Sequence, residues 1–505
     1  MSYIKLVQRF WKASLLTILL LTAYFILYRI YMARVSAFGC FDDCFNIAAG
    51  YFINEGKSLY SDIFFNHQML MPHISAFIQQ LNPVNVYELI LRHRQFILIF
   101  SFVFNLLLIL RFGLSMALFA LFFEFSKFYV FGDRFLAEAI IVYPLIYLSS
   151  LIFYKVLKRK ILLMDYFLAS VFAWFIIFMR EPFVPLAVFL LVIIFYGKLQ
   201  RSKVISLAVF IALVTVTLLL TPLKDYFQNV IVVNSTIFKG GIGLSSLLRS
   251  YFYPFYVVLS SERNPLMLIL TPITLAFILY AFNLVRSKYY ALAAIITVIL
   301  GLANIRSTEP GKIFYESFHL LPWYGLLISF TFLSIFTFFK KYLVVTIVLL
   351  LGCFLLYIPR SFLVEKADPH GEFITNYGHI LEVGNVFSII KEDGDTYFAD
   401  GFDELTHWQV DIPSTYRYSW YTSFMPRFEN YSDARLEMFS DNPPVFYYGS
   451  CPKEKNEERL MPQQYKNLYK NLSRENKATC LYVREDKKIK EEKLEKLKRE
   501  FNLTL

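Results

Sequence analysis

The sequence predicts a polytopic α-helical membrane protein with about 11 transmembrane helices and a small C-terminal α/β domain. Of its 505 residues, 57% are hydrophobic and 19% are aromatic, which is more apolar surface than a soluble protein can bury. The apolar residues form repeated stretches of about 16 to 23 residues, each long enough to cross a hydrocarbon core of ~30 Å as a helix. The formal net charge of +11 is explained by basic segments between these stretches, so it gives no support for nucleic-acid binding.

The predicted spans, in chain order, are 13–34, 95–110, 113–126, 134–154, 161–179, 182–197, 204–221, 264–285, 289–305, 316–339 and 342–358. The first span follows a basic segment, as in a cleaved signal peptide. Its apolar run is too long for that and lacks a small-residue cleavage site, so we expect a permanent helix.

Three connections are long. Residues 35–94 form a first outer loop, 222–263 form a second, and 359–505 form a polar tail. The sequence therefore predicts a transmembrane domain over 1–358 and a soluble α/β domain over 359–505. In the tail we expect a helix near 372–391, strands at 396–400, 445–449 and 480–484, and a closing Lys/Glu-rich helix over 487–501.

The orientation follows from charge. The connections on one side of the predicted helices carry basic residues and no acidic residue: Lys5, Arg9, Lys12, Arg111, Lys155, Lys158, Arg159, Lys160, Lys198, Arg201, Lys203, Arg286, Lys288, Lys340 and Lys341. By the positive-inside rule this side is cytosolic. We therefore expect a multi-pass protein of the plasma (cell inner) membrane, with a cytoplasmic N-terminus and an extracytoplasmic C-terminal domain.

This topology places Cys40, Cys44, Cys451 and Cys480 outside. An oxidising compartment permits a bridge between Cys451 and Cys480, since each flanks a predicted strand. No histidine or further cysteine has a suitable spacing for a metal site beside Cys40 and Cys44.

The most informative stretch lies in the first outer loop, where Asp42 and Asp43 open an apolar segment that Gly56 closes. The pattern predicts a short helix with an acidic first turn. Capping needs one of the two carboxylates. Successive helical positions diverge by about 100°, so the second carboxylate faces elsewhere and is available for catalysis.

The residues that follow carry a resemblance to a known family. Gly56 is succeeded by Leu59-Tyr60-Ser61-Asp62, then by His67 and Pro72. The loop resembles the first outer loop of GT-C glycosyltransferases of the family 39-like group, which includes protein O-mannosyltransferases and lipid A aminoarabinose transferase. That group has an Asp-Glu pair and a His-Pro-Pro segment. Here Asp43 stands in the Glu position, and Gln68-Met69 replace the prolines.

Four more tracts resemble the family in the expected order. They are GDRFLAEAIIVYPL with Arg134 and Glu138, MREPF with Arg180 and Glu181, KIFYESFHLLPWYGLL with Tyr315, Glu316 and Pro322, and STYRYSW in the tail with Tyr416, Arg417 and Tyr418.

The resemblance implies an inverting transfer of one sugar from a polyprenyl-phosphate carrier to a hydroxyl of a lipid, glycan or protein acceptor. Asp42 or Asp43 is then the general base. Glu138, costly to leave unpaired in lipid, is a further catalytic candidate. The leaving phosphate needs fixed positive charge, for which the outer candidates are Arg306, Arg180, Lys312 and Arg249. The other substrate-binding candidates are Asp62, His67, Arg134, Glu181 and Tyr315.

Other interpretations stay open at this point. Arg180 beside Glu181 is also typical of a surface ion pair, and Arg306 of a residue that extends toward lipid headgroups. His67 and His319 are isolated in the sequence, which favours packing roles. A divalent metal ion is a further open question, because relatives differ and no ligand set is evident. The alternative functions are a transporter or lipid flippase, and a non-catalytic envelope assembly protein.

Overall fold

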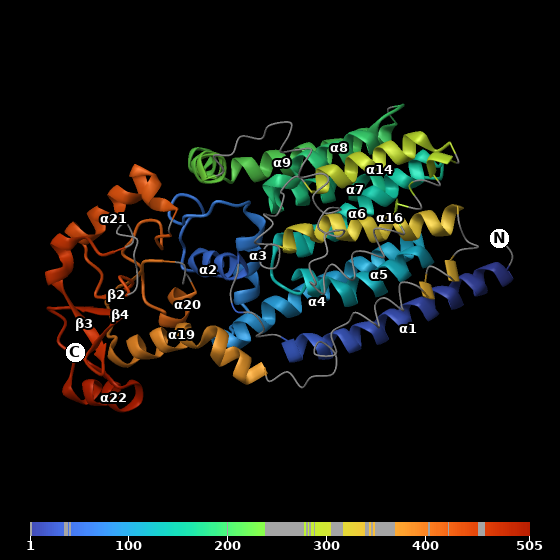
Figure 1. Cartoon of the computed structure of the whole chain (residues 1–505). Coiled ribbons are helices and arrows are strands. Elements are labelled where there is room, and N and C mark those ends of the chain that lie inside the picture. The colour runs from blue at the N-terminus through green and yellow to red at the C-terminus, as the bar shows by residue number, and fades with distance from the viewer. Residues whose placement is uncertain are drawn as a thin grey trace. The chain divides into compact units, whose positions relative to one another are not determined.

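The computed structural model describes residues 3–34, 42–198, 200–237, 288–304, 317–338, 369–401, 405–422, 424–452 and 460–505, together with isolated positions at 39, 277–278, 281, 284–286, 343–344 and 347–348. The structure is mostly helical, with one small sheet (Figure 1). The chain packs as two compact units, which are described separately below.

The first unit comprises residues 1–35, 93–220 and 240–368. Its helices are α1 (Tyr3–Arg34), α4 (Val86–Phe112, which enters this unit at His93), α5 (Leu114–Ser126), α6 (Ala137–Val156), α7 (Leu163–Met179), α8 (Val184–Phe195), α9 (Arg201–Leu219), α14 (Tyr290–Ala303) and α16 (Leu321–Phe338). Short 3-10 helices lie at their ends: η1 (Lys127–Val130), η2 (Glu181–Phe183) and η5 (Ser317–Leu320).

These helices follow the apolar stretches closely. Among the described residues, five helices are long and apolar enough to cross a membrane, and four shorter helices are also apolar. The apolar helices indicate a membrane protein, whereas the total of eleven spans stays a prediction. The expected spans 264–285 and 342–358 lie largely outside the described residues.

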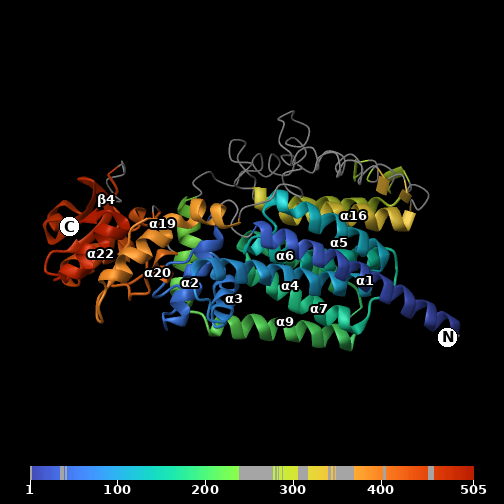
Figure 2. The same ribbon diagram turned by 90° about the horizontal axis from the view of Figure 1, so that it is seen from below.

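Burial separates central from peripheral helices in this unit. Helices α6 and α16 are buried along most of their length, whereas α9 leaves most of its apolar side chains exposed and lies along one edge of the bundle (Figure 2). Gly325 permits the close contact of the central pair, because a Cβ there would lie 2.4 Å from a methyl group of Val142. Exposed apolar side chains on α9 are what a lipid-facing helix requires.

The second unit comprises residues 36–92, 221–239 and 369–505. From the first outer loop it contains α2 (Asp42–Asn54), α3 (Leu70–Gln79) and the start of α4, and from the second α10 (Leu223–Tyr226), the π-helix η3 (Phe227–Val233) and α11 (Asn234–Ile237). The tail adds α19 (Pro369–Ile390), β1 (Tyr397–Ala399), α20 (Thr406–Val410), η7 (Met425–Arg427), α21 (Glu429–Asp441), β2 (Phe446–Tyr448), η9 (Gln463–Leu468), β3 (Tyr469–Arg474), β4 (Lys477–Arg484), α22 (Glu491–Phe501) and β5 (Leu503–Thr504).

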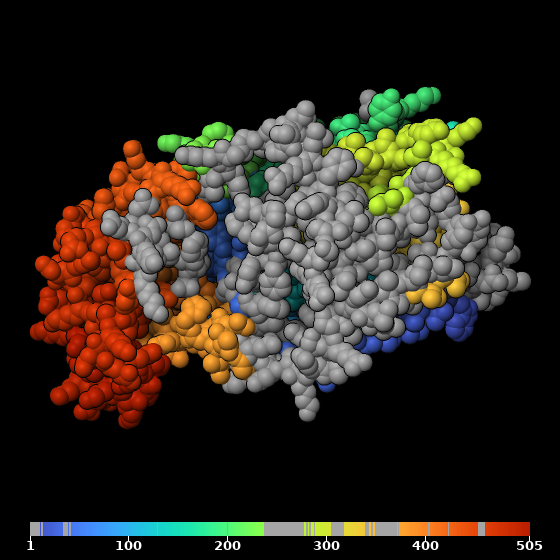
Figure 3. Space-filling view, viewed as in Figure 1, coloured from blue at the N-terminus to red at the C-terminus, as the bar shows by residue number. Residues whose placement is uncertain are grey.

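The strands form one sheet in the order β1-β2-β4-β3-β5. The β1–β2 pair is parallel, with Tyr397 opposite Phe446, and the other pairs are antiparallel. The expected strands near 396–400, 445–449 and 480–484 are present, whereas β3 and β5 were not predicted. The amphipathic helix α22 buries Leu497, and the red C-terminal part of the chain to which it belongs forms part of the surface in Figure 3.

Alternation along the strands creates two cores, one on each face of the sheet. Tyr397 and Phe446 pack with residues of α19 and α22, including Phe387 and Leu497. The neighbouring positions Phe398 and Tyr447 belong to the opposite core, together with residues of α21. That second core also contains Phe64 of the first outer loop and Val233 of the second. Both outer loops thus contribute to the core of the tail.

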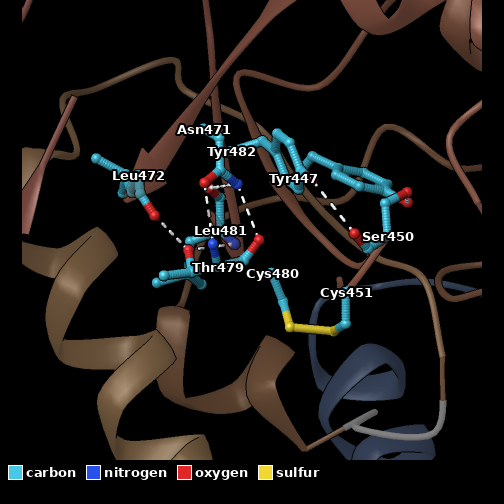
Figure 4. The surroundings of a disulfide bond; sticks show 9 residues. All are labelled: Tyr447, Ser450, Cys451, Asn471, Leu472, Thr479, Cys480, Leu481 and Tyr482. Carbon is cyan, nitrogen blue, oxygen red and sulfur yellow. Dashed lines mark hydrogen bonds between the residues drawn. A yellow bond between two sulfur atoms is a disulfide. The ribbon is translucent and has the colours of Figure 1, made fainter. Parts of the chain in front are cut away.

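A disulfide joins Cys451, just after β2, to Cys480 on β4 (Figure 4). This confirms the pairing predicted from the sequence. Cys44 of α2 is also disulfide-bonded, whereas Cys40 lies outside the described residues.

Candidate functional site

The acidic pair opens α2, as the sequence predicts. Asp42 and Asp43 occupy the first turn, where carboxylates interact favourably with the helix dipole. Asp43 is only 1% exposed, whereas Asp42 is half-buried. The helix is followed by Gly56 at φ +82°, a left-handed conformation that glycine adopts readily. The two adjacent carboxylates therefore occupy different environments, one inside the second unit and one at its surface.

An aromatic surface lies beside Asp42. Phe45 follows it by three positions on α2, so the two side chains occupy neighbouring positions on one helix face. The Phe45 ring stacks on Phe65 with centroids 4.9 Å apart, and the His67 ring meets Phe45 edge-on at 6.1 Å. The structure thus brings His67 to the face of α2 that carries Asp42. The sequence carries no signal for Phe45, because it is one phenylalanine among 54.

Asp62 shapes the turn between these two segments. Its Oδ2 accepts a hydrogen bond from the backbone N–H of Ser58 at 3.0 Å, and its carbonyl accepts one from the Ser419 hydroxyl at 2.9 Å. The carboxylate therefore stabilises the turn over 58–62. A substrate-binding role for Asp62 stays a prediction.

The STYRYSW tract of the tail lies against this same part of the first loop. Lys57 Nζ donates to the Tyr416 carbonyl at 3.4 Å and to the Ser419 hydroxyl at 3.2 Å. The backbone N–H of Phe64 donates to the Tyr418 carbonyl at 3.1 Å. Burial lowers the pKa of Lys57 to about 8, against the smaller opposing effect of the Asp62 charge. The tail tract and the turn of the first loop are therefore in direct contact within the second unit.

The second outer loop holds the first loop from another side. Asn229 of η3 is buried and donates from its amide to the carbonyl of Tyr60 at 3.2 Å. Its Oδ1 accepts from the backbone of Phe65 at 3.3 Å and from the Tyr431 hydroxyl at 3.1 Å. Gln68 is likewise bonded to the Tyr226 hydroxyl at 2.9 Å. The segment leading to His67 is thus fixed by the second loop and the tail together.

The other predicted catalytic residue, Glu138, lies in the first unit. It occupies the first turn of α6 and is 2% exposed. Its Oε1 accepts a hydrogen bond from Arg180 Nε at 3.1 Å and lies 3.0 Å from His319 Nδ1. Arg180 Nη1 also lies 4.0 Å from Glu181. The structure therefore unites Glu138, Arg180 and Glu181, and adds His319, which sequence reasoning had set aside as an isolated histidine.

Arg134 lies in the connection just before α6. It is buried, and its guanidinium lies 5.5 Å from the centroid of the Phe131 ring. The connection packs tightly against its surroundings, because a Cβ on Gly132 would lie 2.7 Å from Lys127 and 3.0 Å from Leu321. The remaining candidates, Arg306, Lys312 and Tyr315, lie outside the described residues, as does Arg249.

A second buried ion pair occupies the interior of the first unit. Lys127 Nζ lies 2.6 Å from Glu124 Oε2 and donates to the Tyr143 hydroxyl at 2.8 Å. The other carboxylate oxygen accepts from Tyr143 at 2.6 Å and from Asn105 at 2.8 Å. The sequence did not predict this network, because its members come from three separate segments: Asn105, the Glu124–Lys127 pair and Tyr143. The pairing compensates both charges, as burial requires.

Among the described residues, no group of three or more His, Cys, Asp and Glu side chains is arranged to hold a metal ion. No protein-family model, curated protein or solved structure matches the chain. The described residues therefore offer two separate candidate clusters. Asp42, Asp43, Phe45 and His67 form one in the second unit, and Glu138, Arg180, Glu181 and His319 form the other in the first.

Proposed function

We propose that the protein is a membrane glycosyltransferase of the GT-C type, which transfers one sugar from a polyprenyl-phosphate donor to an acceptor hydroxyl with inversion. The observation that carries the proposal is the position of Asp42. Its carboxylate is half-buried at the start of α2, on the face that also carries Phe45 and the neighbouring His67 ring. A carboxylate beside aromatic rings suits a glycosyl transfer, because the acceptor hydroxyl gives up a proton while the carbon face of the sugar meets an apolar surface.

In the proposed reaction Asp42 accepts the proton of the acceptor hydroxyl while the hydroxyl oxygen attacks the anomeric carbon. The bond between this carbon and the phosphate oxygen breaks, and polyprenyl phosphate leaves with the electron pair. Asp43 is the second candidate for the base. Because Asp43 is almost fully buried, an interior role that fixes α2 suits it better than proton transfer.

The leaving phosphate requires a cation, and Arg306 remains our first choice, followed by Arg180. Arg180 is already engaged with Glu138. We therefore propose that Glu138 orients Arg180, and that His319 completes the same cluster. Guanidinium groups suit this task, because their fork matches the geometry of a phosphate.

The disulfides support the proposed location. Cys451–Cys480 and the bridged Cys44 belong to the second unit, and such bonds persist in oxidising compartments. This agrees with an extracytoplasmic second unit on a plasma-membrane protein whose N-terminus is cytoplasmic. A donor on the outer leaflet and a lipid, glycan or protein acceptor are the partners that this location permits.

One observation favours a transporter as the second candidate. The pair formed by Glu124 and Lys127 lies inside the helix bundle, and ionisable residues there are typical of ion and substrate pathways. Against this function, both carboxylate oxygens have partners within the bundle, so no charge is left for a passing ion to neutralise.

A glycosyltransferase breaks the bond between the sugar and the phosphate of the donor, whereas a transporter leaves the donor intact. The purified full-length chain is incubated with polyprenyl-phosphate sugars and hydroxyl-bearing acceptors, and polyprenyl phosphate is quantified. A glycosyltransferase releases polyprenyl phosphate and glycosylated acceptor in equal amounts. A flippase moves the intact donor across a vesicle membrane without cleavage, and that result would overturn the proposal.

A further inference from the structure

A tribasic loop connects α6 and α7 in the first unit. Lys158, Arg159 and Lys160 follow one another there, and all three side chains are exposed. Neither the proposed transfer reaction nor the buried clusters use them.

The backbone of this loop is fixed rather than loosely held. Lys158 adopts a left-handed conformation with φ +55°, and its N–H donates to the carbonyl of Lys155 at 2.9 Å. The N–H of Arg159 donates to the carbonyl of Tyr154 at 2.9 Å. On the other side, Arg111 Nη2 donates to the carbonyl of Lys160 at 3.1 Å. The three charged side chains are therefore displayed from a preformed scaffold.

The acidic residue nearest to the loop in the sequence is Asp165, which is already paired. Asp165 receives two hydrogen bonds from the Arg111 guanidinium, each of 2.8 Å, and a third from the Leu162 N–H at 2.6 Å. The loop itself, 157–162, contains no acidic residue. The three cations therefore have no carboxylate within residues 157–162 with which they could pair.

A second basic connection, between α8 and α9, lies beside the first. Lys155 Nζ donates to the carbonyls of Ile193, Ile194 and Tyr196 at 2.7 to 2.8 Å, which joins the end of α6 to the end of α8. The connection carries the exposed Lys198, and the exposed Arg201 begins α9 directly after it. The cationic surface therefore spans both connections at this end of the helices.

Apolar side chains border the cations. Leu163 is 65% exposed and Tyr196 is 78% exposed, and Leu162 and Met164 are also exposed. Arg159 stacks over the ring of Tyr154, with its guanidinium carbon 4.7 Å from the ring centroid. A surface with exposed cations next to exposed apolar side chains fits an amphiphilic anion better than a soluble anion or a nucleic acid.

We infer that the loop over 157–162 is a binding site for the headgroup of an anionic phospholipid. Arg159 and the flanking lysines contact the lipid phosphate, while Leu162, Leu163 and Met164 lie among the acyl chains. The site is independent of the proposed glycosyl transfer, because no residue of the candidate functional site takes part in it.

The test uses the purified full-length protein in a mild detergent, titrated with phosphatidylglycerol or phosphatidylcholine, with bound lipid counted by native mass spectrometry. We expect phosphatidylglycerol to bind more tightly. In the triple variant Lys158→Gln, Arg159→Gln, Lys160→Gln its affinity should fall by about tenfold or more, since each surface cation contributes a several-fold preference for anionic lipid. Phosphatidylcholine binding should change little.

The matched control removes three exposed cations from the second unit, Lys488→Gln, Lys490→Gln and Lys498→Gln, and should leave lipid affinity unchanged. Lipid-free thermal unfolding of both variants checks that they are folded. Equal loss of affinity in the two variants would mean a general charge effect and would overturn the site. Displacement of the lipid by millimolar inorganic phosphate, or unchanged affinity in Leu163→Ser, would overturn a lipid as the occupant.

Discussion

The hydroxyl of Tyr431, in the C-terminal tail, donates a hydrogen bond to Oδ1 of Asn229 over 3.1 Å, although the two residues are 202 positions apart. The same asparagine binds the carbonyl of Tyr60 and the N–H of Phe65. One buried amide thus joins the two outer loops and the tail into one unit. The carboxylate-bearing helix α2 and His67 belong to the loop that this amide fixes.

Replacing Asn229 by Leu should destabilise the second unit by about 2 to 4 kcal/mol, because it leaves several buried polar groups without partners. Thermal unfolding of the purified full-length protein measures the effect. Tyr431→Phe removes a single hydrogen bond and should cost about 1 kcal/mol. If Asn229→Leu and Tyr431→Phe both unfold at the wild-type temperature, the hydrogen bonds by which Asn229 joins the two loops and the tail contribute nothing to stability.

The Cys451–Cys480 disulfide should be formed in the cellular protein and should stabilise the second unit. It closes a loop with a sequence separation of 29, for which about 2 to 4 kcal/mol is typical. Thiol labelling before and after reduction should detect both cysteines only after reduction. The double variant Cys451→Ser, Cys480→Ser should unfold at a lower temperature. Labelling of both thiols without reductant would contradict an oxidising location.

The buried pair of Glu138 and Arg180 should show strong energetic coupling. Glu138→Gln leaves the Arg180 charge buried without its carboxylate, at a cost of about 3 to 5 kcal/mol. Adding Arg180→Met removes that charge and should recover part of the loss. A double-mutant cycle on thermal stability gives the coupling directly. Additive effects would show that the pair does not act as a unit.

Lys57 should make stability depend on alkaline pH. Burial lowers its pKa in the folded protein to about 8, below the value of 10.5 expected for an exposed lysine. Between these values the unfolded chain binds more protons than the folded one, so this residue's contribution to the free energy of unfolding rises with pH, by up to about 3 kcal/mol. Below pH 8 the cost of burying the charge is fully present.

The comparison of wild type with Lys57→Met isolates this contribution, because other groups titrate equally in both proteins. The difference in stability between the two should shift in favour of the wild type as pH rises from 8 toward 10.5. A difference that is independent of pH would mean that Lys57 keeps an ordinary pKa.

The sequence predicted the apolar helices well, because the required length and composition are local properties. The stretch 161–179 became Leu163–Met179, and 113–126 became Leu114–Ser126. It did not predict β3 and β5. These strands contain mostly polar residues, and β5 is formed by Leu503 and Thr504 pairing with the edge of β3.

The site was predicted only in part, for a related reason. The acidic first turn of α2 is visible in the sequence, since Asp42 and Asp43 are adjacent. The neighbour of Glu138 in the fold is His319, 181 positions away, and no local pattern links them. The same holds for Asn229, whose partners lie in two other segments of the chain.

The role of Asp42 as the base of a glycosyl transfer is tested most directly by the transfer rate of Asp42→Asn with a polyprenyl-phosphate sugar donor. Loss of a general base should lower this rate by about 10²-fold or more at an unchanged protein level. Glu55→Gln, an exposed residue just after α2, is the matched control and should keep the wild-type rate. Wild-type transfer in Asp42→Asn, and also in Asp43→Asn, would contradict the account.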